Sequence, residues 1–241
     1  MTPETDLRVN CAKCTKVVCP GAEYLNGPEN CPTKVRGEVI SAAVEHYREP
    51  GLSEFARVAS VVEGSAYTRV PWATSPTPLT TRLEEVIRFA LRMGYKRLGV
   101  AFCAGLANEA EVLIPLLENA GFEVVSVCCK TGGIAKEEIG IKDWEKVNPG
   151  RYESMCNPIA QAEILNNEGC EFNIMMGLCV GHDSLFLKHA KALTTVFAVK
   201  DRLLGHNPLA ALYLSRSYYR RLRSRDLASH LLDESPGAPQ K

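Results

Sequence analysis

Four cysteines near the start of the chain have the spacing of metal ligands. Cys11, Cys14, Cys19 and Cys31 form the pattern C-x2-C-x4-C-x11-C. A C-x-x-C pair presents two sulfur atoms from one tight turn, and two further cysteines complete a tetrahedral zinc site or hold the remaining corners of a [4Fe–4S] cluster. Residues 1–33 are too polar to fold by apolar burial alone, so we predict that they bind a metal. The irregular spacing slightly favours a [4Fe–4S] cluster over zinc.

A second group of cysteines falls where the elements of an α/β fold would end or begin. Cys103, Cys128, Cys129 and Cys179 end predicted strands, and Cys156 directly precedes a predicted helix. The carboxyl ends of parallel strands share one edge of a sheet, and ligands bind there. Adjacent cysteines on an extended strand point to opposite faces, so only one of Cys128 and Cys129 should face such a site. We therefore predict a cofactor-binding site formed by these cysteines.

Helix dipoles favour thiolates at this predicted site. Cys103, Cys156 and Cys179 each lie just ahead of a helix N-terminus, which lowers the pKa of a thiol. Three thiolates with an open coordination position suit a catalytic metal, or a cluster with one labile iron. Cys103 and Cys179 are the catalytic candidates. The alternative is that cysteine serves here as a small core residue, the role that we expect for Cys170.

Polar residues that follow the strands could assist such a site. His182 comes shortly after Cys179 and is a candidate ligand or proton donor, although a solvated histidine at a capped helix start is equally compatible with its position. One of the charges in Lys200-Asp201-Arg202 could orient an anionic substrate. The Gly132-Gly133 turn is a weak candidate for an anion-binding nest.

Hydrophobic periodicity predicts the elements that must position these residues. Short apolar runs predict strands at 97–103, 123–128, 172–178 and 194–199. Helical spacing of apolar residues predicts helices at 34–48, 52–62, 79–93, 106–120, 158–167, 184–191 and 207–232. This alternation predicts an α/β fold with a doubly wound, mainly parallel sheet of about four strands. The expected organisation is a Cys-rich metal-binding segment (1–33), a helical connection (34–78), an α/β domain (79–232) and a disordered tail (233–241).

Composition restricts the environment and the partners. Lys+Arg and Asp+Glu balance at 28 each, so nucleic acid is an unlikely main partner, and we interpret the Tyr/Arg run at 218–225 as a solvated helix face. No apolar run approaches the ~18–20 residues of a membrane span, and the N-terminus lacks the features of a signal peptide. We expect a cytoplasmic protein without a membrane partner. Its ten cysteines are then better explained as ligands or catalytic thiols than as disulfides.

Several segments together resemble a known family. The N-terminal C-x2-C-x4-C set, AFCAGLANEA, CCKTGG, MCNP and GLCVGHDSLF are similar to the bacterial and archaeal family catalogued as domain of unknown function 1847 and described as predicted metal-binding. The resemblance runs from about Cys11 to about Leu214. It implies metal binding and no particular reaction. At the level of site type alone, the chain is also similar to desulfidases that remove sulfur from thiouracil, in which three cysteines hold a [4Fe–4S] cluster whose free iron takes the substrate sulfur.

These observations favour an iron–sulfur protein with one or two [4Fe–4S] clusters, which performs redox or sulfur chemistry on a small molecule. Its partners would be that substrate or an electron-transfer partner. One alternative is a non-enzymatic zinc protein with a structural or sensor role. Another is a nucleotide- or cofactor-binding α/β enzyme that uses the Gly132-Gly133 turn, with a metal in a structural role only.

Overall fold

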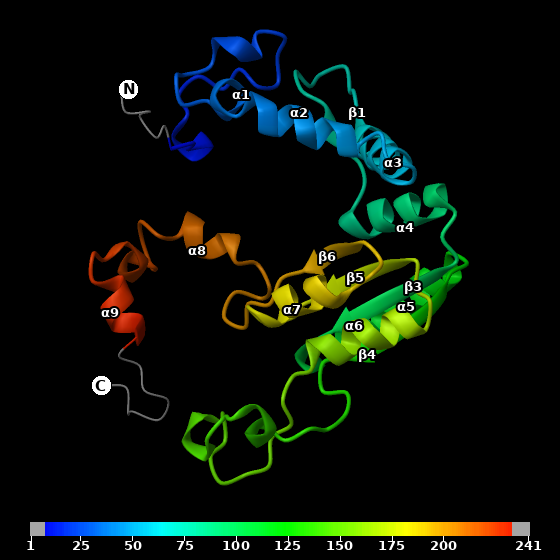
Figure 1. The fold of residues 1–241 in the computed structure, drawn as a ribbon, viewed down its shortest axis with the longest axis vertical. Coiled ribbons are helices and arrows are strands. Elements are labelled where there is room, and N and C mark those ends of the chain that lie inside the picture. Colours follow the sequence, from blue (N-terminus) through cyan, green and yellow to red (C-terminus); the bar gives the residue numbers. More distant parts are fainter. Residues whose placement is uncertain (1–7, 233–241) are drawn as a thin grey trace. The chain divides into compact units, whose positions relative to one another are not determined.

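The computed structural model describes residues 8–232 of the chain (Figure 1). Two compact units make up the fold, Met1–Leu79 and Thr80–Lys241. The predicted disordered tail at 233–241 lies outside the described residues. Within the described part of the chain, no helix combines the length and the apolar character needed to cross a membrane.

The first unit is mainly helical. Its elements are η1 (Cys11–Lys13), η2 (Tyr24–Asn26), α1 (Pro32–Val35), α2 (Gly37–His46), α3 (Leu52–Ser65) and the antiparallel pair β1 (Tyr67–Thr68) and β2 (Thr77–Pro78). The predicted helix at 34–48 is interrupted because Arg36, with φ −135°, leaves the helical region between α1 and α2. Val58 and Val62 lie one turn apart on α3, and both are buried.

The second unit contains the sheet. Its elements before the C-terminal segment are α4 (Arg82–Met93), β3 (Arg97–Phe102), η3 (Ala104–Leu106), α5 (Ala107–Asn119), β4 (Glu123–Cys128), η4 (Lys136–Ile139), η5 (Asp143–Glu145), α6 (Pro158–Asn167), β5 (Phe172–Met176), α7 (His182–His189) and β6 (Thr194–Ala198). The four strands β3 to β6 pair in parallel in the order β4-β3-β5-β6. The predicted α/β class with a parallel, helix-flanked sheet is therefore confirmed.

The strand order places a crevice in the middle of the sheet. The chain moves from β3 to β4 in one direction and then returns past β3 to β5, so α5 and α6 cover opposite faces of the sheet. Helix α6 packs against β4, β3 and α7, whereas α4 packs on the other face, where Phe89 lies 5.3 Å from Phe172 between ring centroids. The order reverses between β3 and β5, which is the position where open α/β sheets bind ligands.

Local signals explain where the helices around the sheet begin and end. Thr81 and Glu84 form a capping box at the start of α4, and Gly94 ends that helix with φ 74°. Asn157 caps α6 by accepting a hydrogen bond from the backbone N–H of Ala160, and Pro158 occupies the first helical position.

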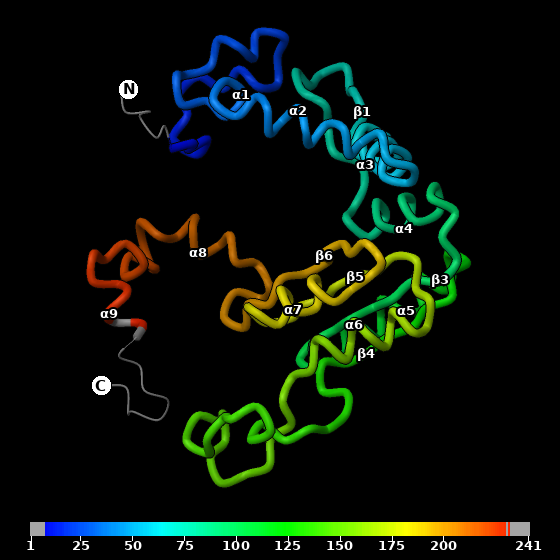
Figure 2. The backbone as a smooth tube through the Cα atoms, in the orientation of Figure 1, coloured from blue at the N-terminus to red at the C-terminus, as the bar shows by residue number. Residues whose placement is uncertain are grey.

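Two parts of this unit differ from regular α/β architecture. Figure 2 traces a long excursion between β4 and α6, residues 129–157, which carries the short helices η4 and η5 away from the sheet. The C-terminus is helical, as predicted, but it consists of three short pieces instead of one helix. These pieces are α8 (Leu209–Tyr213), η6 (Arg220–Arg223) and α9 (Leu227–Leu232).

Candidate functional site

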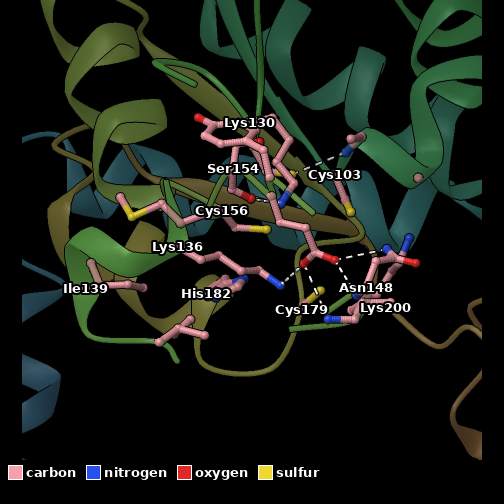
Figure 3. Close-up of a pocket in the computed structure, with 18 of the residues that line it drawn as sticks. Cys103, Lys130, Lys136, Ile139, Asn148, Ser154, Cys156, Cys179, His182 and Lys200 are labelled. Carbon is pink, nitrogen blue, oxygen red and sulfur yellow. Dashed lines mark hydrogen bonds and ion pairs between the residues drawn. The ribbon is translucent and has the colours of Figure 1, made fainter. Parts of the chain in front are cut away.

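A pocket of about 630 Å³ lies at the carboxyl edge of the sheet, and four cysteines line it. They are Cys103 after β3, Cys129 after β4, Cys179 after β5, and Cys156 just before α6. Figure 3 shows Cys103, Cys156 and Cys179 around one space, with His182 beside it. Cys128 does not line the pocket, and the buried Cys170 lies before β5 at the other end of the strands.

Backbone hydrogen bonds fix three of these cysteines relative to one another. The N–H of Cys103 donates to the carbonyl of Met176 at 3.1 Å, and the N–H of Cys129 donates to the carbonyl of Phe102 at 2.9 Å. The N–H of Asn157, next to Cys156, donates to the carbonyl of Cys129 at 2.7 Å. The parallel ladder therefore continues past the strand ends and holds the thiol-bearing segments in register.

A glycine brings the fourth cysteine to the pocket. Gly177 follows β5 with φ 67°, and a Cβ atom there would lie 2.8 Å from both Cδ atoms of Leu106. Its N–H donates to the carbonyl of Ala198 at 2.8 Å. Only glycine combines this left-handed conformation with such close contact, so Gly177 permits the turn that leads to Cys179.

A buried amide ties together the ends of the neighbouring strands β3 and β4. Gln161 on α6 is fully buried, and its Nε2 donates to the carbonyls of Phe102 at 3.1 Å and Val127 at 2.7 Å. These carbonyls directly precede Cys103 and Cys128. A buried amide that loses its hydrogen bonds costs considerable free energy. Gln161 therefore holds the strand ends that carry the thiols in place.

Three of the thiols form a hydrogen-bonded chain. The hydrogen bond with Cys129 lowers the pKa of Cys103 to about 5, and nearby Lys200 adds to this effect. The hydrogen bond with Cys129 also lowers the pKa of Cys156 to about 5, with help from Lys130. The same two hydrogen bonds, together with burial, raise the pKa of Cys129. At neutral pH, Cys129 is therefore a thiol, and its single S–H proton lies between the thiolates of Cys103 and Cys156.

Each of the other three pocket cysteines has its own cationic partner. The pairs are Cys103 with Lys200, Cys156 with Lys130, and Cys179 with Arg202. Arg202 Nη2 donates to the sulfur of Cys179 at 3.0 Å. Lys130 Nζ also donates to the carbonyl of Ser154 at 2.5 Å, which holds the lysine in place. A thiolate beside a lysine is electrostatically stabilised, so Lys200 and Lys130 favour the thiolate forms of Cys103 and Cys156.

The excursion supplies a wall of the pocket that sequence reasoning missed. Lys136 Nζ lies 2.5 Å from Glu153 Oε2, and the two side chains are only 17% and 14% exposed. Asn148 donates to Glu153 Oε1 from its backbone N–H at 2.6 Å and from Nδ2 at 2.9 Å. The hydrogen bond from Lys136 lowers the pKa of Glu153 to about 2. This carboxylate is therefore ionised, and both of its oxygens accept hydrogen bonds. No motif marks these residues, and the Gly132-Gly133 turn that the sequence suggested does not line the pocket.

The excursion should loosen in acid. Because the pKa of Glu153 is lowered from 4.5 to about 2, its contribution to stability is complete above pH 4.5 and is lost as the pH falls toward 2. Trp144, in the same excursion, reports on this change once Trp72 is replaced by phenylalanine. We expect the stability difference between that protein and its Glu153→Gln variant to shrink as the pH falls from 5 to 2. A difference that stays constant over this range would contradict the assignment.

The four N-terminal cysteines also gather around one space. Cys11, Cys14, Cys19 and Cys31 all line a cavity of about 100 Å³ in the first unit. The N–H of Cys14 donates to the carbonyl of Cys11 at 3.0 Å, which forms the tight turn expected of a C-x-x-C pair. Gly27 packs against Cys31, since a Cβ atom at position 27 would lie 3.0 Å from its sulfur.

Neither group of cysteines is closed into a ligand set. Among residues 8–232, no three His, Cys, Asp or Glu side chains are arranged to hold a metal ion. The donor chemistry nevertheless suits soft metals, because both cavities are lined by sulfur. Metal uptake would therefore require the thiols to move inward, as in sites whose closure is coupled to metal binding.

Comparison with known proteins places the chain in a family. A family model described as a protein of unknown function, DUF1847, matches residues 31–197. The chain belongs to this family. An uncharacterised protein of Methanocaldococcus jannaschii is 42% identical over 214 residues, which cover 89% of this chain and 98% of that protein. No solved structure matches the chain.

The family match is shorter than the resemblance found in the sequence. It begins at Cys31, so Cys11, Cys14 and Cys19 precede it, and it ends before Lys200. All four pocket cysteines lie inside the matched stretch. The pocket cysteines therefore belong to the stretch that the family model matches, whereas Lys200 and Arg202 of the pocket and most of the N-terminal cysteine set lie outside it.

Proposed function

We propose that this protein is an iron–sulfur protein whose working site is the pocket at the carboxyl edge of the sheet. The observation that carries the proposal is the convergence of Cys103, Cys129, Cys156 and Cys179, from four separate segments, on one pocket beside the reversal of strand order. Core packing does not account for all four thiols, because Cys103 and Cys129 are buried whereas Cys156 and Cys179 are partly exposed. The reaction in this proposal is redox or sulfur chemistry on a small molecule.

The cysteines divide into ligands and a supporting thiol. Cys103, Cys156 and Cys179, each beside a cation, would hold the metal or cluster as thiolates. Cys129, whose pKa is raised, stays protonated and orients two of those sulfurs by hydrogen bonding. A cluster held by three cysteines supplies, when bound, a Lewis-acidic iron and an electron store. His182 lines the same pocket and is the candidate proton donor to a substrate.

The N-terminal cysteines would form a separate site. In the proposal, Cys11, Cys14, Cys19 and Cys31 hold either an electron-transfer cluster or a structural metal. A single zinc ion is the second candidate for this segment, because the cavity of about 100 Å³ is small. If zinc occupies this site and nothing occupies the pocket, the protein is a non-enzymatic zinc protein.

The deciding experiment is the metal and acid-labile sulfide content of protein purified without oxygen. We compare wild type, Cys179→Ala and Cys128→Ala. Cys128 is the matched control because it also ends β4 but does not line the pocket. Two [4Fe–4S] clusters give about eight iron and eight sulfide per chain, and zinc at the N-terminus would lower this to about four.

Each result separates the hypotheses. The proposal predicts that Cys179→Ala loses about four iron and four sulfide, whereas Cys128→Ala loses none. An absorption spectrum with the broad visible band of a cluster should weaken in parallel. One zinc per chain, no sulfide and no difference between the two variants would refute the pocket as a metal site.

A further inference from the structure

The charges in the pocket are unevenly balanced. Four cationic side chains line it, Lys130, Lys136, Lys200 and Arg202, whereas Glu153 is the single carboxylate among its described lining residues. Lys136 and Glu153 neutralise each other in a well-shielded pair. Three cations therefore remain without a carboxylate partner among the described lining residues, and cysteines are their neighbours.

A bound cluster would not neutralise these cations in full. Its iron is itself cationic, so the cysteine thiolates that bind it would balance less of the charge on Lys130, Lys200 and Arg202. Uncompensated charge in a partly enclosed site is unfavourable, and it is relieved when an anion binds. A metal-loaded pocket would therefore favour the binding of a negatively charged ligand.

The lining of the pocket also includes apolar side chains. Ile139, Ile141, Val147 and Met155 line it, and all four belong to the excursion. Ile139 is 59% exposed and Val147 is 82% exposed, so a ligand could cover apolar surface that the protein leaves open. The pocket volume of about 630 Å³ falls within the range of roughly 300–1,000 Å³ that is typical of sites for small organic ligands.

We propose that the substrate of this pocket is a small organic anion, with an anionic group held by Lys200, Arg202 and Lys130 and an apolar body against the apolar side chains that the excursion contributes. This inference rests on the proposed metal site, because the bound metal leaves the cations unbalanced. Lys200 is the central contact. Its Nζ lies close to the backbone of Gly105, 2.8 Å from where a Cβ atom of residue 105 would be. The excess of cations makes a neutral substrate of the same shape a poor fit.

The test is calorimetric binding to the protein as purified without oxygen. The probes are benzoate, benzenesulfonate and phenyl phosphate, with neutral benzamide and inorganic phosphate for comparison. We expect at least one organic anion to bind about 10-fold or more tightly than benzamide and than inorganic phosphate, because a charge-assisted hydrogen bond contributes about 1.5–3 kcal/mol. If no organic anion exceeds both comparison compounds by this factor, the inference is wrong.

Variants locate the binding. Lys200→Gln should weaken the favoured anion by about 10-fold or more, Lys200→Arg should retain most of the affinity, and Lys188→Gln, on α7 outside the pocket, should have no effect. An equal affinity for Lys200→Gln and Lys188→Gln would overturn the assignment of Lys200.

Metal analysis of the same samples separates the two proposals. Metal in the pocket without anion selectivity refutes the inference and leaves the proposed function intact. Anion selectivity without metal refutes the proposed metal site but supports the ligand class.

Discussion

Replacing Gln161 by glutamate should lower the free energy of unfolding by about 4 kcal/mol at neutral pH, which corresponds to a shift of about three pKa units. The glutamine is fully buried and donates to two carbonyl oxygens, of Phe102 and Val127. A glutamate carboxylate would instead face both oxygens with like charge. It would therefore bind a proton in the folded state, and its pKa would rise well above that of the unfolded chain.

The sign of this effect gives a characteristic pH dependence. A raised folded-state pKa preserves stability below the unfolded value of about 4.3, and stability is lost as the pH rises toward the folded value. Chemical denaturation between pH 4 and pH 8 should therefore show the deficit of Gln161→Glu growing by about 1.4 kcal/mol per pH unit from about pH 4.3 to about pH 7.3 and levelling off above that. Gln161→Met, which has similar length and no charge, should show a smaller deficit that does not change with pH. A pH-independent deficit in Gln161→Glu would show that the residue is not buried against the two carbonyls.

Replacing Gly99 by alanine should destabilise the α/β unit by about 1–3 kcal/mol, the usual cost of overpacking a core. Gly99 lies in β3, and a Cβ atom there would be 2.3 Å from Asn173 Oδ1 and 2.8 Å from Leu165 Cδ1. Both side chains are fully buried, so neither can move away into solvent. Helix α6, which carries Leu165, must then shift away from the sheet.

A second substitution should relieve this clash. Asn173 is the register partner of Gly99 on β5, and within the described residues neither of its side-chain polar atoms has a hydrogen-bond partner. Asn173→Ala creates space beside Gly99, so the double variant should be more stable than the sum of the two single effects predicts. Thermal and chemical denaturation of the four proteins measures this coupling. Strict additivity would mean that the two positions do not contact each other.

Much of the α/β unit could be predicted because its signals are local. The apolar runs at 97–103, 123–128, 172–178 and 194–199 correspond to β3 to β6 with an error of at most two residues at either end. Buried parallel strands consist of continuous apolar residues, and this pattern is visible in one sequence. The predicted helical C-terminus is also confirmed, although the stretch at 207–232 forms three short helical pieces instead of one continuous helix.

The order of the strands predicted most of the cysteines that line the pocket. Cys103, Cys129 and Cys179 follow strands, and carboxyl ends of parallel strands always share one edge, so chain order alone predicts their common location. Alternation along a strand likewise predicted that only one of Cys128 and Cys129 would face the pocket, and Cys129 is the one that lines it.

The groups that surround those thiols could be identified only in the folded structure. The pairing of Cys179 with Arg202, the shielded pair of Lys136 and Glu153, and the contact of Gln161 with two strand ends all join residues that are between 17 and 59 positions apart in the chain. Their geometry depends on how the excursion and α6 pack against the sheet, and no spacing rule encodes such packing. The cysteines at the site were therefore predictable from the order of strands, whereas its charge balance required the folded chain.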